Sequence, residues 1–151
     1  MTRFAGASTA VIDATATTCF EAVCDTPSTP DWHQAIRAVE ILERNNEGRT
    51  SLVRVNIDAM VTTVNVLLRL SYDEPHTITM EREAGDLRHL TVRWTFQEIG
   101  DGRSQASFET EFDPGRVLSA FAKGPIYARL QQLLAEQPPA GLKTHLEQRQ
   151  R

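Results

Sequence analysis

The candidates for chemistry in this chain are polar side chains that share a strand face with apolar neighbours. Tyr72 and Thr110 would each place a hydroxyl there, which can donate and accept hydrogen bonds. His76 opens a strand and could act as a general base, because the pKa of an imidazole lies near neutrality. The sequence shows no partner that would orient this imidazole. Tyr72 could equally cover the edge of a sheet, so its role stays open between ligand contact and packing.

Two arginines could form an anion site. Arg82 and Arg88 flank the turn Gly85-Asp86 and share the parity of inward-facing neighbours. Two guanidinium groups at such a turn could bind a carboxylate or a phosphate through paired hydrogen bonds. The alternative is a surface pair that is neutralised by Asp86, Glu83 or solvent. Both interpretations are compatible with the sequence.

Other reactive patterns are absent from the sequence. It contains no Ser-His-Asp order, no nucleophile elbow and no glycine-rich phosphate loop. Cys19 and Cys24, five residues apart on one predicted helix, would point about 140° apart and are interpreted as two packed thiols. No metal-ligand spacing connects the four histidines, which are His33, His76, His89 and His145. We therefore expect neither a metal nor a cofactor.

The elements that must position these side chains follow a simple order. A strand-like segment at residues 8–14 leads into two short helical patterns, the second of which contains Trp32. Alternating strands then fill residues 37–113, and a helical pattern closes the chain. A long sheet with helices only at its sequence ends must curl around the final helix to bury both apolar faces. Such an arrangement tends to leave a cavity between sheet and helix.

Short turns divide the strand region into hairpins. Turn residues cluster at positions 45–48, 73–75, 85–86 and 100–102, which predicts an antiparallel meander. The predicted fold is α+β, with a seven-stranded curved antiparallel sheet wrapped around a C-terminal helix and two short helices between strands 1 and 2. We expect residues 1–151 to form a single domain. Gly124-Pro125 and residues 137–141 are predicted to interrupt the C-terminal helix.

Charge and hydropathy exclude several function classes. The formal net charge is −4 and the isoelectric point is near 5.6, and the lysines and arginines are scattered singly. Nucleic-acid binding needs clustered positive charge, so no nucleic-acid partner is expected. No apolar run approaches the roughly 20 residues that span a bilayer. We expect a cytoplasmic protein without an integral membrane segment, either a monomer or a homodimer.

The order of these segments resembles the START-like (SRPBCC) superfamily, whose members have the helix-grip fold. The likeness is carried by Pro30-Asp31-Trp32 after the short helices, by residues 39–42, and by residues 83–85, 90–96 and 109–112 in the later strands. It covers nearly the whole chain and is fairly specific for the fold. The superfamily includes polyketide cyclase/dehydrase proteins, lipid-transfer domains, ribosome-associated toxins and chaperone activators, so several functions are compatible with it.

The resemblance to aromatase/cyclases implies particular site residues. In those enzymes a cavity arginine, with tyrosine and tryptophan nearby, is thought to guide a poly-β-keto chain. Trp32 occupies the position of the family's tryptophan, whereas an ungapped alignment from Trp94 puts Leu68 at the arginine position. Arg69 is adjacent, but strand alternation turns it to the opposite face.

Three functional hypotheses follow. The first is binding of a hydrophobic small molecule, such as a lipid, a quinone or a polyketide-like compound, beneath the C-terminal helix. The second is a polyketide cyclase, aromatase or dehydratase that uses Tyr72, His76, Arg82 or Thr110. The third is a protein-interaction module whose helix fills the grip and leaves no void. For Trp94, core packing is the alternative to ligand contact. The expected cavity walls are Trp32, Val55, Ile57, Val66, Leu68, Tyr72, Met80, Trp94, Phe108, Phe112, Phe121 and Tyr127.

Overall fold

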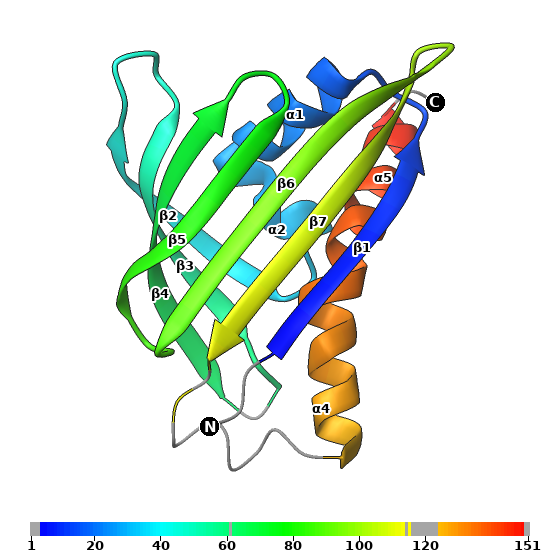
Figure 1. Cartoon of the computed structure of the whole chain (residues 1–151). Coiled ribbons are helices and arrows are strands. Elements are labelled where there is room, and N and C mark those ends of the chain that lie inside the picture. Colours follow the sequence, from blue (N-terminus) through cyan, green and yellow to red (C-terminus); the bar gives the residue numbers. More distant parts are fainter. Residues whose placement is uncertain (1–3, 61, 114, 116–123, 150–151) are drawn as a thin grey trace.

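The sheet has the predicted seven strands and is antiparallel throughout. The computed structural model describes residues 4–60, 62–113, 115 and 124–149. The strands follow the order β1-β7-β6-β5-β4-β3-β2, so that the first strand pairs with the last (Figure 1). The predicted α+β architecture is therefore confirmed. The strands are β1 (Phe4–Ile12), β2 (Ile36–Arg44), β3 (Thr50–Asp58), β4 (Thr63–Asp73), β5 (Thr77–Gly85), β6 (His89–Gly100) and β7 (Arg103–Asp113).

Two short helices connect β1 to β2, as the sequence predicted. Helix α1 (Ala16–Cys24) begins after Thr15, whose hydroxyl accepts a hydrogen bond from the backbone N–H of Thr18 and caps the helix. The 3₁₀ turn Thr26–Ser28 and helix α2 (Thr29–Trp32) each carry a proline in the first turn, where no backbone donor is needed. Strand β1 begins at Phe4, earlier than predicted, because its pairing with β7 extends to Phe112.

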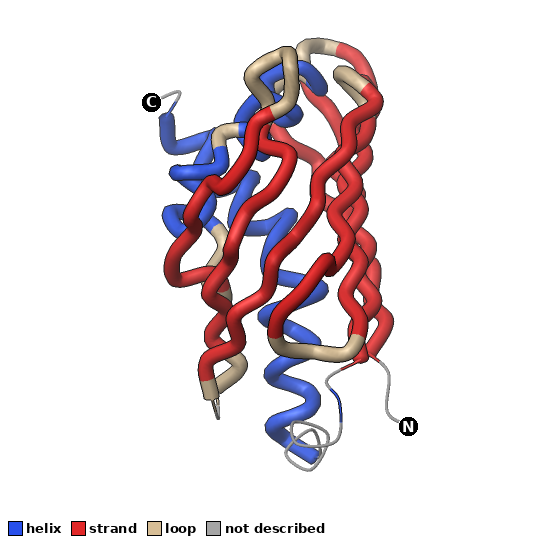
Figure 2. The backbone as a smooth tube through the Cα atoms, turned by 90° about the vertical axis from the view of Figure 1, so that its left-hand side faces the viewer, coloured by secondary structure: helices blue, strands red, loops and turns tan. Residues whose placement is uncertain are grey.

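The C-terminal segment lies against the concave side of the sheet. It comprises α4 (Gly124–Gln131), a π-helical turn (Gln132–Glu136) and α5 (Gln137–Arg149). Figure 2 shows the strands curving around these helices. The break predicted at residues 137–141 is wrong, because helical backbone runs through both prolines. Gly124-Pro125 marks the start of α4, and the residues immediately before it lie outside the described part of the chain.

A contact with β1 explains how the helix tolerates its prolines. Pro139 has no N–H to donate to the carbonyl of Ala135, four residues earlier. The hydroxyl of Ser8 donates to that carbonyl instead, with 2.5 Å between Oγ and O. A Cβ at Gly6 would lie 2.4 Å from the Cβ of Ala135, so glycine lets the π-helical turn approach the strand. Strand β1 thereby satisfies a backbone acceptor that the helix cannot satisfy itself.

Removal of the Ser8 hydroxyl should therefore weaken the contact between strand and helix. We expect Ser8→Ala to lower the free energy of unfolding by about 1–2 kcal/mol, because the half-buried Ala135 carbonyl loses its donor. Urea denaturation followed by circular dichroism measures this difference. Ser71→Ala is the matched control, since Ser71 lies on β4 with its side chain exposed. Equal stability of the two variants would contradict the proposed role of Ser8.

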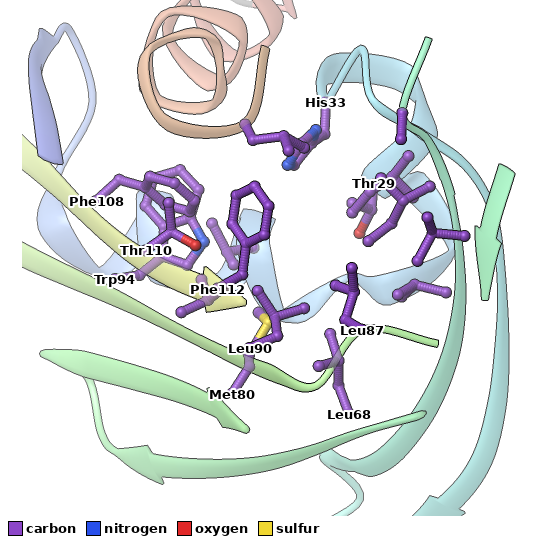
Figure 3. Close-up of a pocket in the computed structure, with 18 of the residues that line it drawn as sticks. Thr29, His33, Leu68, Met80, Leu87, Leu90, Trp94, Phe108, Thr110 and Phe112 are labelled. Carbon is purple, nitrogen blue, oxygen red and sulfur yellow. The ribbon is translucent and has the colours of Figure 1, made fainter. Parts of the chain in front are cut away.

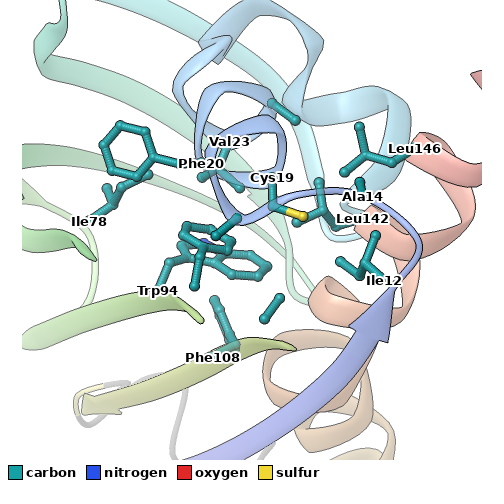
Figure 4. Packing of buried hydrophobic residues seen from close by; sticks show 14 of the residues in the cluster. Ile12, Ala14, Cys19, Phe20, Val23, Ile78, Trp94, Phe108, Leu142 and Leu146 are labelled. Atoms are coloured by element: carbon teal, nitrogen blue, oxygen red, sulfur yellow. The ribbon is translucent and has the colours of Figure 1, made fainter. Parts of the chain in front are cut away.

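The interior divides into two apolar clusters. The first packs α1 and α5 against the sheet around Trp94, Phe20 and Phe96 (Figure 4). The second lies between β3, β4 and the helical segment, and Leu130 of α4 belongs to it. Inward rows on β6 and β7 agree with the predicted alternation, because Trp94 and Phe108 pair across the two strands and both are buried.

Candidate functional site

A cavity of about 110 Å³ lies between the curved sheet and the helical segment (Figure 3). The described walls come from strands β2 to β7, of which β2 contributes Ile36 alone. The helices α1, α2 and α4 and the π-helical turn supply the rest, together with residues of the connecting loops. Among the described lining residues only Thr29, His33 and Thr110 are polar, and none of these carries a formal charge at neutral pH. The lining residues are Val23, Thr29, Trp32, His33, Ile36, Val55, Ile57, Ala59, Val64, Leu68, Met80, Leu87, Leu90, Val92, Trp94, Phe108, Thr110, Phe112, Leu130 and Leu134.

Most of the residues that the sequence proposed as walls face this cavity. They are Trp32, Val55, Ile57, Leu68, Met80, Trp94, Phe108 and Phe112, together with the polar candidate Thr110. The hydroxyl of Thr110 donates to the backbone carbonyl of Thr91 at 3.1 Å and keeps its lone pairs available. Phe121 and the side chain of Tyr127 lie outside the part of the chain that the structure describes.

Two proposed walls lie elsewhere in the core. Val66 is fully buried in the second apolar cluster without reaching the cavity surface. Tyr72 packs edge-on against Phe20, 6.2 Å between ring centroids, and its hydroxyl donates to the carbonyl of Thr50 at 2.6 Å. Burial raises the pKa of this phenol. Tyr72 is therefore not among the described residues that line this cavity, and it packs instead, which is the alternative that the sequence left open.

Arg82 and His76, two further candidates for chemistry, are also absent from the described lining of the cavity. Arg82 donates to the carbonyls of Gly85 and Asp86, at 2.7 and 3.3 Å, so it closes its own hairpin turn instead of projecting into the interior. His76 is exposed in the turn between β4 and β5. Strand parity did not anticipate either position, because the side chain at a strand end can bend back toward the turn.

The arginine beside Leu68 faces outward, as strand alternation predicted. Leu68 lies in the cavity wall and is 3% exposed. Arg69 forms ion pairs on the opposite face of the sheet, with Glu83 at 2.8 Å and with Glu43 at 3.3 Å. No arginine or lysine occurs among the described residues that line the cavity.

Sequence reasoning missed several lining residues for two different reasons. Val64 has the same strand parity as Leu68, and Leu90 and Val92 have that of Trp94, so alternation along the strands could have included them. His33 follows the last residue of a four-residue helix, where no periodicity assigns a direction to a side chain. The remaining missed residues are Val23, Thr29, Ile36, Ala59, Leu87, Leu130 and Leu134.

His33 is the polar residue that the fold brings to the cavity. Its backbone is satisfied, because its N–H donates to Thr29 at 2.9 Å and its carbonyl accepts from Ile36 at 3.1 Å. The side chain is 8% exposed, and Figure 3 shows the ring directed toward Phe112 and the cavity interior. Burial lowers the pKa of the imidazole from 6.5 to about 4, so the ring is neutral at pH 7.

The helical segment fixes the backbone on both sides of His33. The carboxamide of Gln137 donates to the carbonyl of Trp32 at 2.8 Å and accepts from the N–H of Gln34 at 3.0 Å. A Cβ at Gly141 would lie 2.1 Å from the same Trp32 carbonyl, so α5 approaches the end of α2 closely. These contacts hold the imidazole in its position at the cavity wall.

No group of three or more His, Cys, Asp or Glu side chains in the described ranges is arranged to hold a metal ion. Within the same residues, no helix has the length and hydropathy that a membrane-spanning segment requires.

Comparison with known proteins identifies a family and a fold. The family model described as polyketide cyclase/dehydrase and lipid transport matches residues 3–147. A START superfamily protein from Mycobacterium smegmatis superposes with a TM-score of 0.82 at 21% identity, over 95% of this chain and 97% of that one. The Zhui aromatase/cyclase from Streptomyces sp. R1128 gives a TM-score of 0.81 at 17% identity, over 99% and 97% of the two chains.

A larger enzyme contains a similar unit. The di-domain aromatase/cyclase BexL of the BE-7585A biosynthetic pathway superposes with a TM-score of 0.68 at 16% identity, over 95% of this chain and 46% of that chain. No curated protein sequence matches the chain. At these identities the three structures establish the likeness of the fold.

Proposed function

The chain belongs to the polyketide cyclase/dehydrase and lipid transport family, and we propose that it binds a hydrophobic small molecule in the cavity beneath its C-terminal helices. The apolar lining is the observation that carries this proposal. Displacing water from such walls, and from the ligand, contributes about 25 cal/mol per Å² of apolar surface removed from water.

The size of the cavity limits the ligand. Pockets for drug-sized ligands usually measure about 300–1,000 Å³, whereas an apolar cavity of about 150 Å³ accommodates benzene. The cavity of this protein measures about 110 Å³. A single ring with small substituents, or a short branched chain, is therefore the size of ligand that the described walls suit, and a larger ligand requires the walls to move.

Binding accounts for the lining better than the alternatives. Cyclisation of a polyketide-like substrate in the manner of the aromatase/cyclases would use a cavity arginine. The ungapped alignment puts Leu68 at that position, and no arginine occurs among the described lining residues. In a protein-interaction module the C-terminal helix would fill the space inside the curved sheet, whereas a cavity of about 110 Å³ remains there. Both observations favour a binding protein.

A cavity-filling substitution tests the proposal. We expect wild-type protein to bind p-xylene with a Kd on the order of 0.1–1 mM. This Kd corresponds to a standard free energy of binding of about −4 to −5.5 kcal/mol, which is reasonable for an apolar ligand with few atoms. Val92→Phe adds a ring to the cavity wall and should weaken this binding at least tenfold. Both tryptophans of the chain, Trp32 and Trp94, line the cavity, so their fluorescence reports directly on its occupancy.

The control makes the same chemical change outside the cavity. Val11 on β1 is 44% exposed, and Val11→Phe should bind p-xylene as the wild type does. Thermal denaturation of each variant verifies that it is folded. Equal binding by the Val92→Phe and Val11→Phe variants, or no binding by the wild type, would show that the cavity is not a ligand site.

A further inference from the structure

Two adjacent aromatic side chains at the cavity carry buried polar atoms without partners. The Nε1 of Trp32 and the Nδ1 of His33 are buried and have no hydrogen-bond partner among the described residues. The side chains are 5% and 8% exposed, and both belong to the cavity wall. A buried polar atom without a hydrogen bond is costly, and such atoms in folded proteins call for an explanation.

The surrounding contacts show that this arrangement is built into the fold. The backbone of both residues is engaged, through Gln137 at the Trp32 carbonyl and through Thr29 at the His33 N–H. The two rings are neighbours, with 5.9 Å between their centroids and an angle of 38° between their planes. The indole also packs edge-on against Trp94 at 5.7 Å, which restricts its orientation.

We propose that the ligand carries an uncharged hydroxyl group on an otherwise apolar ring, and that this hydroxyl hydrogen-bonds to His33 and Trp32. This inference rests on the proposed binding function and adds the chemical class of the ligand. The indole N–H can only donate, whereas a hydroxyl oxygen can accept from it and donate its own proton to an unprotonated imidazole nitrogen. One hydroxyl thus offers the acceptor that the indole N–H requires and the donor that an unprotonated imidazole nitrogen requires.

The lack of positive charge in the described lining disfavours the binding of anions. The imidazole is neutral at pH 7, since burial lowers its pKa to about 4. The described lining contains no lysine or arginine that could neutralise a carboxylate. Transfer of an ionised group into such a cavity is strongly unfavourable. A phenol therefore fits the site, and the corresponding benzoate does not.

Two probes of nearly the same shape separate the effect of the hydroxyl from that of the ring, and a third tests the effect of charge. The probes are p-cresol and p-xylene, in which a hydroxyl replaces a methyl group, and the anion 4-methylbenzoate. We expect wild-type protein to bind p-cresol at least as tightly as p-xylene, and 4-methylbenzoate at least tenfold more weakly than p-cresol. His33→Phe should lower the affinity for p-cresol relative to that for p-xylene ten- to a hundredfold, because only the hydroxyl loses its partner.

Two further variants distinguish the loss of a hydrogen bond from a change in cavity shape caused by the phenylalanine. Asparagine carries an amide near the place of Nδ1, so His33→Asn should restore part of the preference for p-cresol. Trp32→Phe removes the indole N–H and should reduce that preference as well. In ¹H–¹⁵N spectra of wild-type imidazoles, p-cresol should shift the His33 nitrogens and p-xylene should leave them nearly unchanged.

The outcomes distinguish this inference from the proposed function. If no probe binds the wild type, the cavity is not a ligand site and both fail. If p-xylene and p-cresol bind but His33→Phe leaves their affinity ratio unchanged, the proposed function stands and the hydroxyl site is refuted. Tight binding of 4-methylbenzoate would likewise overturn the preference for an uncharged ligand.

Discussion

Trp94→Ala is expected to lower the free energy of unfolding by about 3–5 kcal/mol, the usual cost of removing a buried tryptophan. Trp94 is 2% exposed and lies where the first apolar cluster meets the cavity. Its ring stacks on Phe96 at 5.7 Å and contacts Phe108 edge-on at 4.8 Å between centroids. These neighbours belong to the sheet, so they cannot collapse into the space that the indole leaves.

Urea denaturation of the wild type, Trp94→Ala and Trp94→Phe measures this effect. The phenylalanine variant keeps a ring in contact with Phe108 and should lose clearly less stability than the alanine variant. The alanine variant should also gain space for ligands, so saturating p-xylene should raise its melting temperature more than that of the wild type. A loss below about 1 kcal/mol would show that Trp94 contributes little to the core.

Acidification is expected to destabilise the protein through His33. The folded protein holds the pKa of this imidazole near 4, whereas the unfolded chain has the ordinary value of 6.5. Between these values the unfolded state binds a proton that the folded state does not, so stability falls as the pH is lowered. The full difference amounts to about 3 kcal/mol, reached near pH 4.

A comparison of variants isolates this contribution. Glu21 and Asp58 also have pKa values lowered by arginine partners, Arg49 and Arg37 respectively, and they lose stabilisation on acidification in every variant. Urea denaturation at pH 7 and pH 4.5 should show a smaller loss for His33→Phe and His33→Asn than for the wild type, by about 2–3 kcal/mol. If the free energy of unfolding fell by the same amount in all three proteins between pH 7 and pH 4.5, the fold would not protect His33 from protonation.

The period of two along the strands predicted which side chains face the interior of the sheet. A period of two assigns each side chain to one face of a strand, and burial of one face then fixes which side chains point inward. Leu68 and Arg69 illustrate this, because one lies in the cavity wall and the other forms ion pairs outside. The same rule placed Trp94 and Phe108 inside, and hairpin turns fixed the antiparallel order.

Prediction from local patterns failed where such a pattern does not determine the direction of a side chain or the end of a helix. Arg82 and Tyr72 lie on inward rows, yet their long side chains reach partners at the ends of the sheet, the carbonyls of Gly85 and Thr50. The prolines at positions 138 and 139 were predicted to end a helix, because proline breaks a helix that must satisfy its own carbonyls. Here Ser8, distant in sequence, supplies one of the missing donors.

The amino-acid sequence by itself determined the seven antiparallel strands, the apolar character of their inner face and the enclosing C-terminal helices. Only the tertiary structure decided that His33 and Trp32 line the cavity and keep buried polar atoms without partners, because their positions depend on contacts with Gln137 and Gly141 more than 100 residues later. Alternation along a strand is a local property that a sequence displays directly. The direction of a side chain in a short loop is set by the packing of distant segments, which only the folded chain brings together.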